Sequence, residues 1–404
     1  MMVSVDTLLI GRDNRRGAAR IATVLAALLL AACNGGETTG TATGATPATG
    51  ATPATATTPA TGATPATSTM PATGATSPSG SKCGSTPAQL VDFNTLAKEA
   101  GASGIGAMQL AVDATSVYFV FGGALRSVPI RGGAVSLMRP LLPDVGQNCD
   151  AIVTPTSVVL HHVSSDGTNN EQVFSVPISG GQDTILATSS DFVRGLATDG
   201  HDVYFVDSVG LKSVAATGGN VQVLSDQIGP EPTGLAVVGS NLVVTAGNAV
   251  VSVPIGGGPL TTLAPQQPNA EFPMACGPDT CWWTGAPPSA MGPTGPGYIA
   301  RLHGGSVTTI SAPVYPWSLA FDRANFFETV GCDVCSGTLV RISPSGTPLP
   351  VTMNSAGFVA VDNECAYFSV VEGLDLPSDG GAGIPGTGIY SVEKSYAEPM
   401  PTNK

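Results

Sequence analysis

A repeated pattern of four short apolar runs, with a period of about 40 residues, is the feature of this sequence that most restricts its fold. The clearest copy spans residues 110–138, and the third copy reproduces it at residues 196–224. Seven units of four strands predict an all-β, seven-bladed β-propeller, because four strands per repeat is the usual content of a propeller blade. A solenoid is the main alternative. Positions equivalent to Leu110 recur at spacings of 39 to 45 residues, at Ala151, Leu196, Leu235, Met274, Leu319 and Val359.

The composition fits many short strands joined by tight turns. Glycine is abundant, at 51 residues, and charged residues make up only 11% of the chain, whereas helical proteins rely on Glu, Lys and Arg for their polar faces. Glycine pairs such as Gly132 and Gly133 supply the positive φ values that hairpin turns need. The formal net charge of −13 repels phosphate groups, which disfavours nucleic acid as a partner.

The two ends of the repeat region predict how the ring closes. The seventh copy supplies only three runs, the last at residues 389–392. An additional run at residues 89–96 precedes the first copy and resembles the fourth run of other units. We expect this run to be the fourth strand of blade seven, because it then covers an otherwise exposed sheet edge. The propeller domain is therefore predicted at residues 83–397, followed by a tail at residues 398–404.

The N-terminus has the features of an export signal. Four arginines precede an apolar run at residues 21–32, which is too short for a bilayer that needs roughly 20 apolar residues. The run ends in Leu30, Ala31, Ala32 and Cys33, which resembles the lipobox of bacterial lipoproteins. This resemblance implies a lipoprotein signal peptide at residues 1–32 and a diacylglycerol on the Cys33 thiol. An ordinary signal followed by a chance cysteine is the alternative.

The residues after Cys33 predict the location and the tether. Asn34 stands where an Asp marks inner-membrane retention in enterobacterial lipoproteins, which favours a lipid-anchored place in the outer membrane and leaves its periplasmic or surface side open. Residues 37–82 are almost wholly Thr, Ala, Pro, Gly and Ser, so the segment at residues 33–82 cannot bury enough apolar surface to offset the entropy of ordering. We expect a disordered linker that spans roughly 35–40 Å.

Two repeat motifs suggest a family. The segments at residues 204–207 (Tyr-Phe-Val-Asp) and 282–285 (Trp-Trp-Thr-Gly) resemble degenerate forms of the Tyr-Trp-Thr-Asp motif of low-density-lipoprotein-receptor propellers. Those propellers have six blades and this chain has seven repeats, so their ring closure and partner chemistry are not carried over. The chain also resembles the broad, functionally undefined class of propeller lipoproteins in environmental bacteria.

Seven of the eight cysteines remain after Cys33, in a compartment where cysteines are expected to pair. We expect a Cys276–Cys281 disulfide across the turn between the first two strands of blade five. A Cys332–Cys335 disulfide is predicted in the sixth repeat, although a Cys-x-x-Cys can also be redox-active or half a zinc site. The closure model places Cys83 and Cys365 at the same end of blade seven and predicts a third disulfide. Cys149 is then left over.

No catalytic or metal-binding set stands out. His161 and His162 are adjacent in a predicted strand and point to opposite faces, so they do not readily share a ligand, and His201 and His303 lie at turns. We predict no catalytic residues, no metal and no cofactor. Aspartates recur at one repeat position, as turn-capping carboxylates do, rather than converging as an acid/base pair would: Asp113, Asp199, Asp322 and Asp362.

The long loops lie on one predicted face. In a propeller, the turns between strands one and two and between three and four form one face, here called the hairpin face. The turns between strands two and three and the blade-to-blade connections form the other, here called the connection face. The connection face carries the insertions at residues 164–171, 285–297, 332–337 and 373–388. It also carries the candidate binding residues, Phe192, Arg194, Glu231, Glu271, Phe272, Tyr315, Trp317 and Phe358.

Arg194 and Trp317 are the favoured candidates, because each lies two residues before a first strand, where side chains can rim the central channel. The alternative is that the aromatic residues seal the joints between blades. Together these features predict a membrane-anchored extracytoplasmic binding or scaffolding lipoprotein with a protein, small-molecule or carbohydrate ligand. Its membrane contact is through the lipid anchor only. The rival prediction is an enzyme at the channel mouth, such as a lyase or lactonase, and a third is a purely structural envelope protein.

Overall fold

A computed structural model describes most of the repeat region. The signal peptide, Cys33, the linker and the tail lie outside the described residues, as do Cys149, Cys332, Cys335 and Asp322. The described residues are 83–100, 108–140, 151–163, 170–229, 232–267, 270–277, 279–285, 297–312, 316–321, 326–330, 338–342, 348–352, 356–370 and 386–395.

The described strands form seven four-stranded antiparallel sheets, one for each sequence repeat. Blade 1 contains β2 (Met108–Val112), β3 (Ser116–Phe121), β4 (Ala124–Pro129) and β5 (Ser136–Pro140). Blade 2 contains β6 (Ala151–Val153), β7 (Ser157–Val163), β8 (Glu171–Pro177) and β9 (Thr184–Ser189). Blade 3 contains β10 (Gly195–Thr198), β11 (Asp202–Asp207), β12 (Gly210–Ala215) and β13 (Gln222–Ser225). Blade 4 contains β14 (Pro232–Val238), β15 (Asn241–Ala246), β16 (Ala249–Pro254) and β17 (Thr261–Ala264).

The remaining blades follow the same order. Blade 5 contains β18 (Ala270–Cys276), β19 (Thr280–Gly285), β20 (Gly297–His303) and β21 (Ser306–Ala312). Blade 6 contains β22 (Pro316–Phe321), β23 (Phe326–Val330), β24 (Thr338–Ile342) and β25 (Pro348–Thr352). Blade 7 contains β26 (Ala356–Val361), β27 (Cys365–Val370), β28 (Gly388–Glu393) and, from the other end of the repeat region, β1 (Ala88–Asp92).

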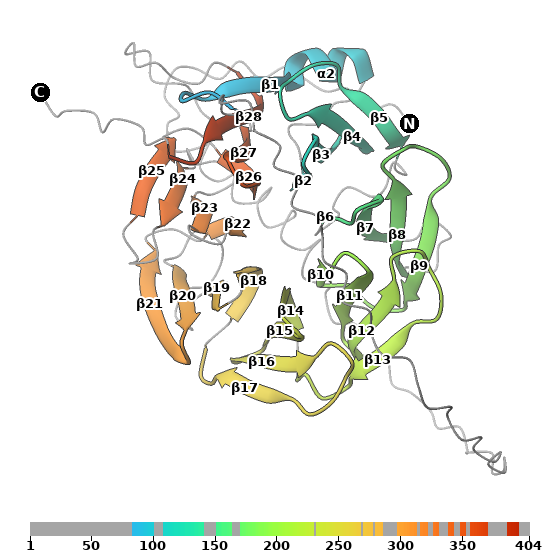
Figure 1. The fold of residues 1–404 in the computed structure, drawn as a ribbon, viewed down its shortest axis with the longest axis vertical. Helices are drawn as coiled ribbons and strands as arrows, with labels where there is room; N and C mark the ends of the chain where they lie inside the picture. The colour runs from blue at the N-terminus through green and yellow to red at the C-terminus, as the bar shows by residue number, and fades with distance from the viewer. Residues whose placement is uncertain are drawn as a thin grey trace, which may run out of the picture. The chain divides into compact units, whose positions relative to one another are not determined.

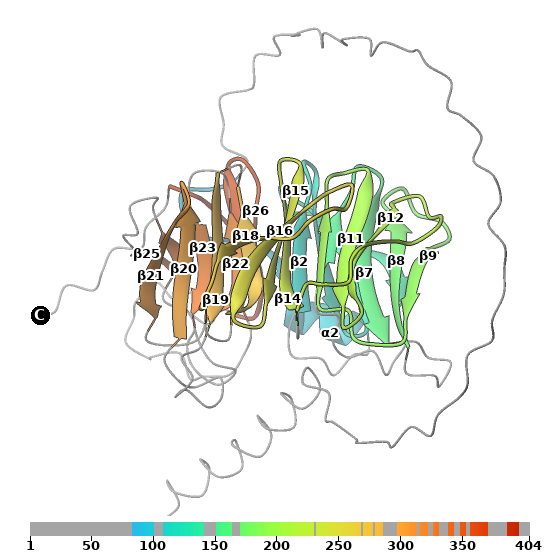
Figure 2. The same ribbon diagram turned by 90° about the horizontal axis from the view of Figure 1, so that it is seen from below.

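The blades are arranged around a central axis, with the first strand of each blade innermost (Figure 1). Each first strand contacts the first strands of the two neighbouring blades, and β26 contacts β2, so the ring is closed. In side view the sheets stand upright between two faces, and the helix α2 (Phe93–Ala100) lies at the lower one, which is the connection face (Figure 2). The predicted all-β propeller is confirmed.

The core lies between the blades. In β11, Val203 and Phe205 belong to the cluster shared with blade 2, whereas Tyr204 and Val206 belong to the cluster shared with blade 4. Neighbouring residues in a strand point to opposite faces, so one strand supplies two joints. This double burial explains why the second strands are continuous apolar runs rather than alternating ones.

The predicted closing strand is correct in its first half and wrong in its second. β1 pairs with β28, from Ala88 opposite Ser391 to Asp92 opposite Gly388. At Phe93 the chain turns into α2 instead of continuing as a strand to residue 96. Asp92 caps this helix, because its carboxylate accepts the Asn94 N–H at 2.9 Å and the Thr95 hydroxyl at 2.8 Å.

The helical spacing also explains the change from strand to helix. Phe93 and Leu96 are three residues apart, so they share one side of the helix, and both are buried in the cluster between blades 7 and 1. The Phe93 ring stacks on Phe121 of blade 1, with ring centroids 4.9 Å apart. As a strand, these two residues would lie on opposite faces of the sheet.

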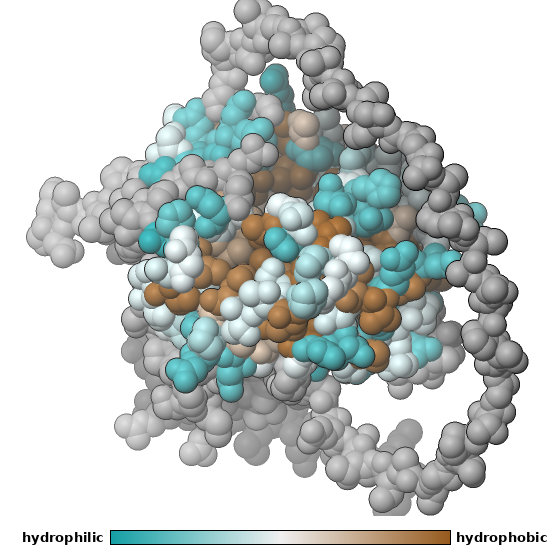
Figure 3. Space-filling model, turned by 60° about the horizontal axis from the view of Figure 1, so that its bottom comes forward, coloured by the Kyte–Doolittle hydropathy of each residue, from teal (hydrophilic) through white to brown (hydrophobic). Residues whose placement is uncertain are grey.

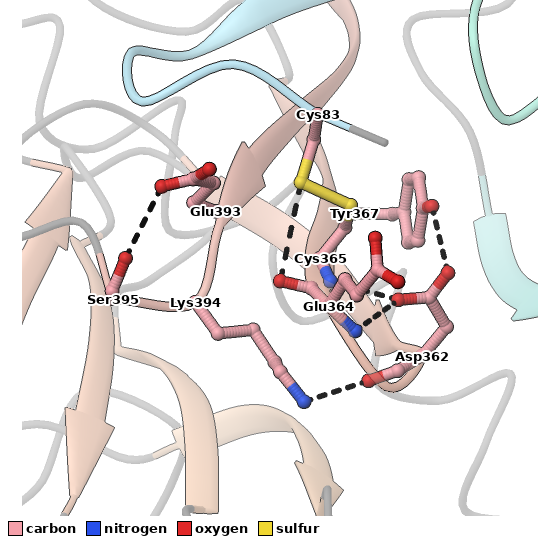
Figure 4. The surroundings of a disulfide bond; sticks show 8 residues. All are labelled: Cys83, Asp362, Glu364, Cys365, Tyr367, Glu393, Lys394 and Ser395. Carbon is pink, nitrogen blue, oxygen red and sulfur yellow. Dashed lines mark hydrogen bonds between the residues drawn. A yellow bond between two sulfur atoms is a disulfide. The ribbon is translucent and has the colours of Figure 1, made fainter. Parts of the chain in front are cut away.

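Two of the three predicted disulfides are present. Cys83 and Cys365 are joined across a separation of 282 residues, at the end of blade 7 where Asp362 and Tyr367 also lie (Figure 4). Cys276 and Cys281 are joined across the first turn of blade 5. The Cys83–Cys365 bond therefore adds a covalent closure to the backbone pairing of β1 with β28.

The Cys83–Cys365 bond should contribute more to stability than the local Cys276–Cys281 bond, because it closes a far longer loop of the unfolded chain. We expect the C83S/C365S double variant to lose about 4–5 kcal/mol of unfolding free energy and C276S/C281S about 2 kcal/mol. Urea denaturation under oxidising conditions measures both. Equal losses in the two variants would show that ring closure does not depend on this bond.

Candidate functional site

The hairpin face is held by a repeated aspartate–tyrosine contact. The Asp199 carboxylate accepts the backbone N–H groups of His201 and Asp202 through Oδ1, each at 2.8 Å. Its Oδ2 accepts the hydroxyl of Tyr204 at 3.0 Å. The carboxylate thus caps the turn between strands one and two and also satisfies a tyrosine whose ring is buried in the joint.

The same contact occurs in blades 1 and 7. Asp113 accepts the Tyr118 hydroxyl at 2.7 Å, and Asp362 accepts the Tyr367 hydroxyl at 3.1 Å. The predicted turn-capping role is therefore confirmed for Asp113, Asp199 and Asp362. The carboxylates and hydroxyls of these pairs already have hydrogen-bond partners within the fold, so they offer little to a ligand.

The electrostatics of the contact follow from its geometry. Burial opposes ionisation of Asp113 and Asp199, but the hydrogen bonds that their carboxylates accept outweigh it and hold both pKa values below the usual value. Burial, together with the nearby carboxylate, raises the pKa of Tyr118 and Tyr204. At neutral pH each pair is therefore a neutral phenol that donates to an anionic carboxylate.

The connection face is built on bulges at the starts of the inner strands. The register shifts near the start of β2, β14, β18, β22 and β26, each within a few residues of the first paired position. In blade 3, Arg194 donates its backbone N–H to Val206 O at 2.9 Å, just ahead of β10. Such bulges re-aim side chains at the rim of a sheet. Counting two residues back from the aligned strand centre gives one equivalent position per blade, at Met108, Cys149, Arg194, Thr233, Phe272, Trp317 and Gly357, of which Cys149 lies outside the described residues.

Three of the predicted binding residues thus hold one equivalent position. Arg194, Phe272 and Trp317 occupy the first-strand starts of blades 3, 5 and 6. Phe272 and Glu271 lie in β18 and Trp317 in β22, but their side chains are outside the described part of the structure. Glu231 and Tyr315 are outside the described residues altogether.

The other predicted residues are placed more fully. Phe192 lies in the connection between blades 2 and 3 and is exposed. Arg194 is half-buried. Phe358 is half-buried and packs against the apolar cluster between blades 7 and 1, which is the joint-sealing alternative. Of the predicted insertion at residues 164–171, Glu171 belongs instead to β8, because it pairs with Val163 as the first residue of the strand.

Sequence reasoning missed a buried polar cluster at the joint between blades 2 and 3. His161 in β7 and Glu171 in β8 face this joint, with His161 Nδ1 2.9 Å from Glu171 Oε2. Their side chains are only 1% and 7% exposed. Glu171 Oε2 also accepts the backbone N–H of Val193 at 3.0 Å. The carboxylate therefore ties blade 2 to the start of blade 3.

A second carboxylate completes the cluster from the side of blade 3. Asp207 Oδ2 accepts the Ser189 hydroxyl of blade 2 at 2.7 Å and forms an ion pair with Lys212 Nζ at 2.5 Å. Asp207 is fully buried. A single sequence signal existed for this residue, since it ends the Tyr-Phe-Val-Asp segment. No comparable signal marked Glu171 or His161.

The His161–Glu171 pair does not resemble a working acid/base site. Its second ring nitrogen, Nε2, is buried and makes no hydrogen bond to any described residue. A general base must reach the proton that it abstracts, and this nitrogen is closed to solvent. Within the described stretches, no group of three or more His, Cys, Asp or Glu side chains is placed to hold a metal ion. Nor is any helix there long and apolar enough to cross a membrane.

The outer rim is a weaker candidate surface. Several aliphatic side chains are exposed on the outer strands and the turns beside them, including Leu137, Ile185, Val221 and Val223. Apolar and polar residues lie interspersed on the side where blade 4 comes forward (Figure 3). Exposed aliphatic residues that are scattered singly are normal on soluble proteins, so the rim alone indicates no site.

No protein-family model and no curated protein matches the chain. Solved structures do match it. One chain of the mitotic checkpoint complex is 14% identical, with a TM-score of 0.51, covering 74% of this chain and 94% of that one. The propeller domain of the Trilobed protease from Pyrococcus furiosus, which has an open velcro topology, is 9% identical, with a TM-score of 0.50, covering 66% and 92%.

A chain of the nidogen/laminin complex is 15% identical, with a TM-score of 0.39, covering 49% of this chain and 82% of that one, and is too distant to carry an argument. At identities below 25%, the two better matches show a shared fold alone, which for the Trilobed protease domain is a β-propeller.

The loss of thermal stability at acid pH should depend on the aspartate–tyrosine contacts. The pKa of Asp113 and Asp199 is lower in the folded chain than the roughly 3.9 of an unfolded Asp, so their contribution is complete above about pH 4 and is lost as the pH falls through the folded pKa. We expect the D113N/D199N variant to show a smaller loss of Tm than the native chain between about pH 5 and pH 2.5.

Thermal melts followed by circular dichroism measure this slope. The Y118F/Y204F variant is the matched control, because it removes only the phenol donors and should give an intermediate slope. A native slope in the D113N/D199N variant would show that other groups govern acid unfolding.

Proposed function

We propose that this chain is a lipid-anchored extracytoplasmic binding or scaffolding protein that uses the connection face of its propeller. The observation that carries the proposal is the contrast between the two faces. On the hairpin face, Asp113, Asp199 and Asp362 are consumed in capping turns. On the connection face, one equivalent backbone position carries a different side chain in each blade where it is described.

This contrast is what a binding scaffold requires. Rigid strands fix the position of each first-strand start, while the residue there varies between the cationic Arg194, the aromatic Trp317 and Thr233, whose hydroxyl lies 3.0 Å from that of Thr245. Binding residues are commonly displayed in this way, on connections positioned by a rigid framework. The propeller fold is compatible with this role but does not select a ligand.

The anchor and location belong to the same proposal. The Leu-Ala-Ala-Cys segment that ends at Cys33 supports lipidation, and the polar segment at residues 33–82 supports a tether between anchor and propeller. A protein, a carbohydrate or another small molecule is the proposed ligand, and the lipid is the proposed membrane contact.

The connection face should capture partners that the hairpin face does not. We expect the R194A/W317A variant to lose ligand or partner capture with Tm nearly unchanged, because Arg194 precedes β10 and Trp317 lies at the irregularity near the start of β22. Photo-crosslinking in the native cell measures this, with the reactive residue placed at Thr233 in the native and R194A/W317A backgrounds. The matched control places it at His201, which is 85% exposed at a turn of the hairpin face.

Adducts of one defined mass from Thr233, lost in the variant and absent from His201, are the expected result. Equal adducts from both faces, or unchanged adducts in the variant, would count against the connection face as the site.

Lipidation makes a separate prediction. We expect cells fed an alkyne-tagged fatty acid to label the native chain and not the C33S variant, because the thioether to diacylglycerol needs the Cys33 thiol. The C149S variant serves as the control for thiol loss elsewhere and should label normally. Label retained by C33S would overturn the proposed anchor.

A further inference from the structure

A cavity of about 330 Å³, here called the blade-3 cavity, opens at the hairpin end of blade 3. Its lining comes from β11, β12 and β13 and from the turn that joins the last two strands. Small-molecule sites in proteins commonly have volumes of roughly 300–1,000 Å³. The blade-3 cavity is at the lower end of this range, so it is large enough for one small molecule.

The cavity exists where blade 3 departs from the repeat. Ala215 lines it and stands where blades 1, 2 and 4 carry a proline, at Pro129, Pro177 and Pro254. In blades 1 and 4 the proline ring lies 3.5 Å from the place that a Cβ on the second glycine of the turn would take. Around the equivalent Gly219 of blade 3, no heavy atom of a described residue lies within 4 Å of that place, its chain neighbours apart. Ala215 therefore leaves open a space that the proline ring occupies in blades 1 and 4.

Four polar side chains line the blade-3 cavity, and the fold brings them there from separate segments: Asp202, Ser213, Asn220 and Gln222. Ser213 is paired with Tyr204 on one side and with Gln222 on the other, so these three side chains share one face of the sheet. Asp202 lies two residues before Tyr204 in β11 and therefore shares that face. Asn220 comes from the turn between β12 and β13.

Most of these polar groups have no partner within the described part of the chain. Ser213 is only 9% exposed, yet its hydroxyl makes no hydrogen bond to a described residue. The same holds for the side-chain amides of Asn220 and Gln222. Asp202 Oδ1 lies 3.1 Å from Nδ1 of His201, and Oδ2 has no described partner. A hydroxyl so far from solvent is costly to leave unpaired, so the cavity is suited to a polar ligand.

The carboxylate at this position is specific to blade 3. The residue equivalent to Asp202 is Ser116 in blade 1, Ser157 in blade 2 and Asn241 in blade 4. Both this carboxylate and the net charge of −13 favour a cation over an anion. The ring of His201 beside it is 85% exposed, so solvent screens any positive charge that the ring carries.

The polar groups of the lining also select the chemistry of the cation. An ammonium group has three donors and no acceptor, and its strongest hydrogen bonds are to a carboxylate. Side-chain amides and the serine hydroxyl both donate and accept, as the hydroxyl groups of a sugar do. A small molecule that carries one ammonium group and several hydroxyl groups therefore matches the lining.

We propose that the blade-3 cavity binds an amino sugar, with the ammonium group on the Asp202 carboxylate and the sugar hydroxyl groups on the other polar side chains of the lining. The cavity lies on the hairpin face and uses none of the turn-capping aspartates. It is therefore a second site, separate from the connection face of the proposed function.

NMR on the full chain with isotope-labelled alanine methyl groups tests the proposal, with the Ala215 resonance assigned by its loss in A215P. Three ligands with six-membered rings are titrated: glucosamine, glucose, which lacks the ammonium group, and cyclohexylamine, which lacks the hydroxyl groups. We expect glucosamine to shift the Ala215 resonance and to saturate it at millimolar concentration. Binding of the other two ligands should be at least about fivefold weaker, because each forgoes part of the hydrogen bonding.

Two substitutions copied from other blades separate the carboxylate from the cavity. D202N, which gives blade 3 the residue of blade 4, should weaken glucosamine about tenfold, because the charge-assisted hydrogen bond is lost. D202N/N241D is the matched control, since it restores the net charge but places the carboxylate in blade 4, where Pro254 stands opposite; it should bind as weakly as D202N.

A215P fills the cavity with the residue that blades 1, 2 and 4 carry, so the fold should accept it with little change in Tm. Saturation transfer from the protein to the glucosamine protons measures binding in this variant, and we expect it to be lost. Transfer that survives in a folded A215P would place glucosamine elsewhere on the chain and overturn the proposal.

The proposal is also overturned if glucosamine leaves the Ala215 resonance unmoved, if glucose or cyclohexylamine binds as tightly, or if D202N binds as the native chain does. These failures leave the proposed function standing, because crosslinks from Thr233 report on the opposite face. Conversely, a saturable Ala215 shift without adducts from Thr233 would remove the connection face and keep this cavity. An amino-sugar adduct from His201 is recognised by its own small mass.

Discussion

Each blade of this propeller is a sheet buried on both faces, and the rest of the structure depends on that constraint. The second strands are buried along nearly their whole length, and the alternate residues of each strand enter two different joints. A single blade would therefore expose apolar surface on both sides, and fully burying one large apolar side chain contributes about 1.5–3 kcal/mol. The blades are stable only as neighbours, so the ring must close, and the fold recruits β1 and the Cys83–Cys365 bond to close it.

The same constraint explains where polar chemistry is found. Inside a joint, a polar group must bring its partners with it, because an unpaired buried group is costly. Tyr204 reaches the edge of its joint, where Asp199 accepts its hydroxyl. At the joint between blades 2 and 3, Asp207 and Glu171 are buried and each accepts several donors. Each of these two carboxylates accepts backbone N–H groups of a surface segment. The hydrogen bonds that satisfy the buried carboxylates therefore also fix the conformation of those surface segments.

Much of this fold could be predicted from the repeats, because each blade of a propeller corresponds to one copy of the apolar sequence pattern. The repeat spacing located the inner strands, and the incomplete seventh copy located the closing strand β1. The helix α2 was not predicted, since residues 93–96 are apolar enough for a strand. The decision between strand and helix lay in the cap formed by Asp92 and in the packing of Phe93 on Phe121. Both interactions depend on the folded structure and cannot be recognised from one strand-like run of sequence.

The candidate site was predictable only in outline. Position in the repeat marked Arg194 and Phe192 as surface residues of the connection face, because connections vary while strands repeat. The support beneath them was not predictable, because His161, Glu171 and Ser189 come from three different strands of blade 2, and Glu171 and Ser189 reach Val193 and Asp207 only when blades 2 and 3 pack. Their positions in the sequence follow no shared motif, so only the folded joint shows that they act together.

The pairing of β1 with β28 joins the first and the last strand of the propeller to be synthesised. A ribosome makes β1 first and β28 last, and almost the entire propeller separates the two in the sequence. Until the last blade exists, the first strand has no sheet to join and Cys83 has no thiol to meet. Such long-range pairing is intrinsically slow to form. A nascent chain thus carries an unfinished sheet edge and an unpaired Cys83 thiol until the last blade has been made.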